Sequence, residues 1–122
     1  AQSGGSAWPR TAAGVASLFY AGIYEDEAIE KGLDFLQRTP TPGGGGPGHA
    51  HFFYGHYYAV QAMYQAGGDR WVHWWNGTQG ILLSRQSSQG GWNDPHVGAA
   101  YGTAMALITL QLPEGLLPIL QR

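Results

Sequence analysis

Three histidines lie close together in this sequence and are the first candidates for chemistry. His49, His51 and His56 carry the side chain that proteins use most often to bind transition metals. Steps of 2 and 5 residues do not bring them to one face of a helix, because helical neighbours on a face are three or four residues apart. We therefore expect polar or hydrogen-bonding roles for these histidines and no metal site.

The carboxylates form a second set of candidates. Asp94 and His96 flank a proline and could serve as an acid and a base, but Asp before Pro is also typical of an Asx-type turn. We expect that turn, leading into the helix that follows. The run Glu25-Asp26-Glu27 is expected to cap the start of a helix, where the helix dipole favours negative charge.

The densest group of aromatic side chains falls in one short segment. Its candidate ligand-binding residues are Phe53, Tyr54, His56, Tyr57 and Tyr58. An aromatic wall with a few hydroxyl groups suits an apolar or isoprenoid-like ligand, or an inserted peptide. The alternative interpretation is that these rings pack between helices as ordinary core, and both interpretations stay open.

Helical periodicity accounts for the elements that must position these residues. Apolar residues recur at steps of three and four, as on one face of a helix, in the segments 10–22, 25–39, 51–66, 71–82 and 101–112. We expect Gly22 and Gly67 to end helices, Asp69 to cap the fourth helix, and residues 40–48, rich in Pro and Gly, to form a loop. The predicted class is all-α.

Composition limits the classes of protein that the chain can belong to. Its 122 residues suit one domain, and 43% hydrophobic residues are enough for a packed core. The absence of Cys excludes disulfides and zinc–thiolate sites. A net charge of −2 indicates no nucleic-acid partner, and no apolar run has the roughly 20 residues of a transmembrane helix. With only 11% charged residues, much of the surface is expected to be covered in the native state.

The helix pairs repeat along the chain. A shift of 45 residues places Ala21-Gly22 on Ala66-Gly67, and a further shift of 47 places Tyr54-Gly55 on Tyr101-Gly102. We therefore predict repeat units at about 8–48, 49–92 and 93–122. A helix pair cannot bury its apolar face alone, so neighbouring units are expected to stack on one another.

A motif follows the fourth predicted helix, and its key residues are Gly77, Leu82, Gln86, Gly90 and Trp92. It resembles the QW motif of the prenyltransferase/squalene oxidase repeat family, to which the squalene–hopene cyclases belong. A degraded copy occupies residues 31–40, the segment 2–8 resembles the tail of a copy cut off upstream, and residues 101–122 resemble the C-terminal end of uncharacterised bacterial repeat proteins. The motif is expected to be structural, with the amide of Gln86 satisfying backbone groups at a helix end beneath the ring of Trp92.

The resemblance implies an α/α-toroid, here a partial, open one of about five helices, in which the odd helices are inner and the even helices outer. It implies a non-catalytic repeat scaffold that binds a protein or an apolar ligand on its inner-helix surface, with no cofactor. The Asp-rich acid motif of the cyclases and the Cys-containing zinc site of the prenyltransferases have no counterpart in this chain.

Two alternatives remain. The chain is the C-terminal part of an isoprenoid-processing enzyme whose catalytic motif lies upstream, or it is a stand-alone module that oligomerises. The rest of a toroid or a second copy is then expected to cover the open ends. The sequence itself indicates no compartment, and an exported or cell-envelope location is one that the resemblance allows.

Overall fold

The computed structural model describes residues 4–38 and 51–115, and these form an all-α fold. The elements are α1 (Gly4–Tyr20), α2 (Glu27–Arg38), α3 (Phe52–Ala66), α4 (Gly68–Ser84), α5 (Ala99–Gln111) and the short 3-10 helix η2 (Leu112–Glu114). Five long helices match the five segments predicted from periodicity. The predicted loop at 40–48 and the residue His49 lie outside the described residues.

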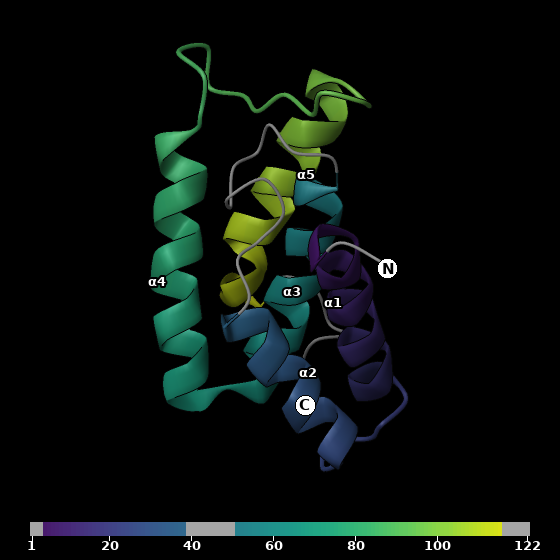
Figure 1. Ribbon diagram of the computed structural model, residues 1–122. Helices are drawn as coiled ribbons and strands as arrows, with labels where there is room; N and C mark the ends of the chain where they lie inside the picture. The colour runs from purple at the N-terminus through teal and green to yellow at the C-terminus, as the bar shows by residue number, and fades with distance from the viewer. Residues whose placement is uncertain (1–3, 39–50, 116–122) are drawn as a thin grey trace.

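Helix α3 is the centre of the arrangement (Figure 1). It contacts α1, α2, α4 and α5, while α2 also packs on α1. Its side chains are buried nearly all the way round, as expected for a helix that is apolar on more than one face. One core cluster joins α1, α2 and α3, and a second forms around Phe52, Phe53, Leu82, Trp92 and Ala106.

Helix α1 begins earlier than the predicted 10–22, because its apolar stripe extends back by one turn. Trp8 lies inside the helix and is fully buried on the same face as Ala12 and Val15. Ile23 continues the helical spacing of this face in the sequence, but it is exposed, because the helix has already ended. Gly22, with φ 83°, ends it in a Schellman arrangement, as predicted: Ile23 N–H donates to Leu18 O and Gly22 N–H to Phe19 O.

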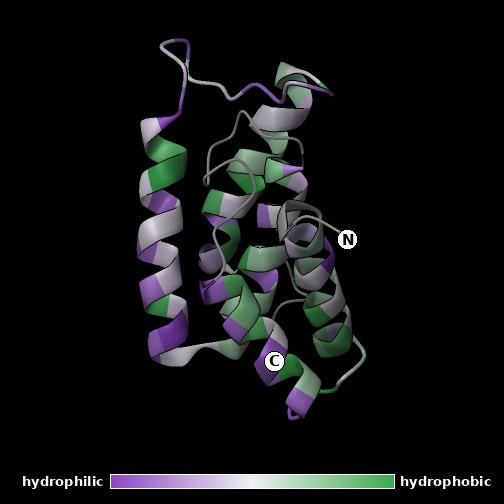
Figure 2. Ribbon diagram, viewed as in Figure 1, coloured by the Kyte–Doolittle hydropathy of each residue, from purple (hydrophilic) through white to green (hydrophobic). Residues whose placement is uncertain are grey.

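Helices α2 and α4 bury the faces that periodicity predicts. In α2 these are Ile29, Leu33 and Leu36, and the acidic run at its start is exposed, with Asp26 accepting a hydrogen bond from the Ala28 N–H at 2.7 Å. Helix α4 buries Trp74, Thr78 and Leu82 and runs without a break through Asn76-Gly77. Figure 2 shows hydrophilic residues along much of α4 and an apolar segment near its C-terminal end.

Two predictions about helix details are wrong. Asp69 is not the cap of α4, since the helix already begins at Gly68 and Gly67 occupies the cap position. Helical spacing in the segment 101–112 predicts one buried face made of Tyr101, Ala104, Met105, Ile108 and Leu112, but the buried residues of α5 are Gly102, Ala106 and Thr109. Helix α5 is apolar on every side, so periodicity could not select the buried face, and close backbone packing at Gly102 selects it instead.

Candidate functional site

The five aromatic candidates divide into buried and exposed residues. Phe53 is 1% exposed and His56 is 2% exposed, so both belong to the core. Tyr57 and Tyr58 are half-buried, and Tyr54 is 38% exposed. The hydroxyl-bearing rings are therefore the ones available to a ligand.

His56 is a neutral core residue. Its ring stacks on Phe52 with centroids 4.0 Å apart and also lies against Trp8 and Trp74. Burial lowers the pKa of His56 to about 4, while its hydrogen bond to the Phe52 carbonyl opposes that shift. Nδ1 lies 2.9 Å from that carbonyl and must donate to it, because a carbonyl only accepts.

Five tyrosines from three helices form a group that we call the tyrosine row: Tyr20 of α1, Tyr57, Tyr58 and Tyr54 of α3, and Tyr101 of α5. The ring of Tyr58 lies 5.0 Å from that of Tyr57 and 5.1 Å from that of Tyr54, both edge to face. At one end of the row the hydroxyl of Tyr20 donates to the amide oxygen of Gln61.

The pKa values of Tyr20 and Tyr101, at the two ends of the row, are both raised, and tyrosines of α3 contribute to both shifts. Burial raises the pKa of Tyr20 to about 12, with Tyr57 and Tyr58 adding to the shift. Burial also raises the pKa of Tyr101, and Asp94, Tyr54 and Tyr58 add to it. Tyr20 and Tyr101 were not identified from the sequence as members of this group, because 37 residues separate Tyr20 from Tyr57 and only the packing of α1 on α3 brings them together.

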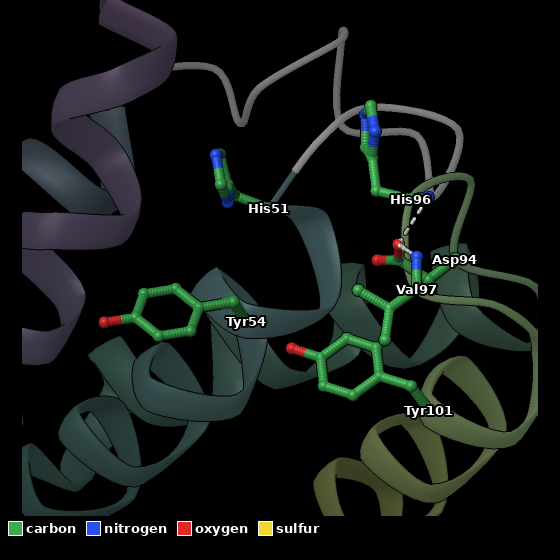
Figure 3. Close-up of a pocket in the computed structure, with 6 residues that line it drawn as sticks. All are labelled: His51, Tyr54, Asp94, His96, Val97 and Tyr101. Carbon is green, nitrogen blue, oxygen red and sulfur yellow. Dashed lines mark hydrogen bonds between the residues drawn. The ribbon is translucent and has the colours of Figure 1, made fainter.

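A recess of about 190 Å³ lies at the other end of the row, between the start of α3 and the turn before α5 (Figure 3). Its lining residues are His51, Tyr54, Asp94, His96, Val97 and Tyr101. Tyr54 and Tyr101 belong both to the row and to the recess. His51 precedes α3 in the left-handed conformation, with φ 67°, which is uncommon for a residue other than Gly.

Asp94 organises the floor of this recess through the predicted Asx-type turn. One carboxylate oxygen, Oδ1, accepts the backbone N–H groups of His96 and Val97, each at 2.8 Å. The backbones of Asp94 and Gly98 exchange two further hydrogen bonds, which close the turn. Asp94 is only 4% exposed, and Figure 3 shows its second carboxylate oxygen turned toward the recess.

The residues predicted to form the QW-like motif differ in their surroundings, and the roles of Trp92 and Gln86 differ from the expectation. The indole N–H of Trp92 donates to the Leu82 carbonyl at 2.8 Å, so the ring itself reaches the last turn of α4. Gln86 does not reach the helix end; its amide donates to the Gly90 carbonyl at 2.8 Å and holds the following loop. Gly90 has φ 93° and needs the freedom of glycine, whereas Gly77 has open space around it.

The histidines do not assemble a metal site among the described residues. His51 is exposed and lines the recess, while His56 is buried in the core. Within residues 4–38 and 51–115, no three His, Cys, Asp or Glu side chains are placed to hold one metal ion.

Comparison with protein families, with characterised proteins and with solved structures found no match to this chain. No helix in the described part of the chain is both long enough and apolar enough to cross a membrane. The assignment of function therefore depends on the site itself.

Proposed function

We propose that the chain is a non-catalytic repeat scaffold of the α/α-toroid type, whose inner helices bind an apolar ligand or a protein segment. The tyrosine row is the observation that carries this proposal. It presents partly exposed rings from three consecutive odd-numbered helices, and Tyr20 and Tyr54 expose 39% and 38% of their surface.

The helix contacts support the toroid order. The helices α1, α3 and α5 contact one another in series through α3, while α2 packs on α1 and α4 packs on α3. This is the order expected if the odd helices are inner and the even ones outer. The residues of the QW-like motif run from Gly77 inside α4 to Trp92 in the loop that follows it, so the motif belongs to an outer helix in the proposed arrangement.

The chemistry of the row suits a ligand that is mostly hydrocarbon. Phenol rings supply large apolar surfaces at a small cost in side-chain entropy, and each keeps a hydroxyl group that can orient a polar end of the ligand. Burial raises the pKa of Tyr20 and of Tyr101, so both phenols are uncharged at neutral pH, and the hydroxyl of Tyr20 is already used in its hydrogen bond to Gln61.

Binding of the isoprenoid alcohol farnesol, followed by the NMR signals of the tyrosine rings, tests the proposal. We expect saturable shifts confined to the row, and an affinity about tenfold lower in the double variant Tyr57→Ala/Tyr58→Ala, because each lost ring removes apolar contact area. Tyr24→Ala is the matched control, since Tyr24 is exposed outside the row.

Circular dichroism of each variant verifies that the helices are retained. An absence of saturable binding by farnesol and by a panel of apolar peptides would overturn the proposal. An equal loss of affinity in the Tyr24→Ala control would also overturn it.

A further inference from the structure

The recess beside Asp94 has a chemical character that the rest of the tyrosine row lacks. Apolar and aromatic groups of Tyr54, Val97 and Tyr101 form its walls, and a nearly buried carboxylate lies at its floor. A dry cavity of about 150 Å³ accommodates benzene, so a recess of about 190 Å³ has room for a group of similar size.

The carboxylate of Asp94 is only partly used by the protein. Both backbone N–H groups that it accepts reach the same oxygen, and the second oxygen is turned toward the recess (Figure 3). Among the described residues, no lysine or arginine lines the recess. A cation entering the recess can therefore form a charge-assisted hydrogen bond with the second oxygen without displacing the backbone N–H groups from the first.

The other polar groups at the recess favour a cation that donates hydrogen bonds. His51 and His96 line it, together with the hydroxyl-bearing rings of Tyr54 and Tyr101. A neutral imidazole has one nitrogen that accepts a hydrogen bond, and a phenol oxygen accepts as well. A primary ammonium group has three donors, so it can bond to the carboxylate oxygen and still donate to other acceptors or to water.

We propose that this recess binds an organic ammonium group, with its charge against the free oxygen of Asp94 and its hydrocarbon part against Tyr54, Val97 and Tyr101. The proposal does not depend on binding along the row, because only the end of the row contributes to the recess. An anion is disfavoured by the carboxylate. A bare metal ion is disfavoured because no three suitable ligands converge in the described part of the chain.

Calorimetric titration of the full chain at neutral pH with three probes of equal length tests the ligand class. We expect hexylammonium to bind at least about tenfold more tightly than hexanol, because a charge-assisted hydrogen bond is stronger than a neutral one. Hexanoate should not bind measurably. Equal affinity for hexylammonium and hexanol would overturn the proposal.

The variant Asp94→Asn isolates the role of the charge. Asn also accepts backbone hydrogen bonds in Asx turns, so the turn and the fold should be retained, as circular dichroism would verify. We expect the preference for hexylammonium over hexanol to disappear in this variant. Asp69→Asn makes the same change of net charge at an exposed position of α4 and should leave the preference intact.

Two sources of the ammonium group are distinguished by a further probe, a lysine capped at both ends by acetyl and methylamide groups. Tighter binding of capped lysine than of hexylammonium would identify a lysine side chain of a protein partner. The reverse order would identify a free amine. An unchanged preference in Asp94→Asn would overturn the proposal with either probe.

Discussion

The indole N–H of Trp8 in α1 donates to the carbonyl of Leu36 in the last turn of α2, at 3.2 Å. Trp92 makes the equivalent bond to Leu82 in the last turn of α4, at 2.8 Å. Each tryptophan therefore donates to a carbonyl in the last turn of an even-numbered helix, and the Leu82 carbonyl also accepts the Arg85 N–H at 3.2 Å. Leu36 and Leu82 are 46 residues apart, which is close to the period of the predicted repeat. The two tryptophans differ in their place in the sequence, because Trp8 comes before α2 and Trp92 comes after α4.

Trp92→Phe should destabilise the fold, because the variant loses the hydrogen bond to Leu82 and leaves space beside a buried cluster. We expect the free energy of unfolding to fall by about 1–3 kcal/mol, measured by urea denaturation. Trp75→Phe provides the control, since Trp75 is half-buried and stacks on Trp71. An effect of Trp75→Phe as large as that of Trp92→Phe would contradict the role assigned to Trp92.

Alanine substitutions at two glycines of the predicted repeat should change the free energy of unfolding in opposite directions. A Cβ on Gly102 would lie 2.7 Å from the Trp92 carbonyl oxygen and 2.8 Å from the Asp94 nitrogen. These are backbone atoms that cannot move aside easily, so Gly102→Ala should lower the free energy of unfolding by about 1–3 kcal/mol or more. Gly77 is exposed inside α4 with nothing near its Cβ position, so Gly77→Ala should raise it by about 0.5–1 kcal/mol.

Thermal melts of the two alanine variants test this pair. A stabilised Gly102→Ala variant would show that the backbone of α5 does not lie against Trp92 as described. A strongly destabilised Gly77→Ala variant would mean that the glycine of the QW-like motif has a packing role that the structure does not show.

Sequence periodicity is sufficient to predict the buried face of a helix wherever the helix has one clearly apolar face. It predicted the buried stripes of α2 and α4, and local chemistry predicted the glycine end of α1 and the Asx turn at Asp94. Helix α5 could not be predicted in the same way, because its apolar residues surround the helix and Gly102 decides the buried face by close approach to Trp92.

The candidate site was predicted only in part for a similar reason. The aromatic segment of α3 was found from its composition, but the sequence could not separate Phe53 and His56, which are buried, from the tyrosines that remain exposed. The contributions of Tyr20 and Tyr101 arise from the packing of three helices, and the recess arises where the Asp94 turn lies over the start of α3. No local pattern in the sequence encodes either juxtaposition.

Arg70 links α4 to α2 through three polar contacts. Its guanidinium lies 3.0 Å from Asp34, 3.1 Å from Gln37 and 3.3 Å from Glu30. The two carboxylates are half or more exposed, so water screens these ion pairs and their contribution is modest. We expect Arg70→Met to lower the free energy of unfolding by up to about 1 kcal/mol at low salt, and the difference from wild type to shrink in about 1 M salt.

The exposed pair of Lys31 and Glu27 within α2 provides a matched control. Lys31→Met removes the same charge from a contact that lies within one helix, and it should change the stability by less than Arg70→Met does. Denaturation of both variants at two salt concentrations checks the expectation. A larger effect from Lys31→Met would show that Arg70 does not connect the two helices energetically.

The burial of His56 should make the stability of the fold depend on pH. Burial lowers the pKa of His56 from 6.5 to about 4, so the unfolded chain takes up the proton at a higher pH than the folded protein does. The contribution of the neutral imidazole is complete above pH 6.5 and is lost as the pH falls toward about 4. The full loss is about 3 kcal/mol.

Urea denaturation at a series of pH values between 7 and 4, compared among variants, measures this dependence. His56→Phe keeps an aromatic ring among Phe52, Trp8 and Trp74 and should flatten the part of the pH dependence that comes from His56. His73→Gln replaces an exposed histidine of α4 and should leave the dependence as it is in the wild type. An NMR titration of the wild-type protein is independent of any variant's folding, and protonation of the folded His56 ring near pH 6.5 would contradict its assignment as a neutral core residue.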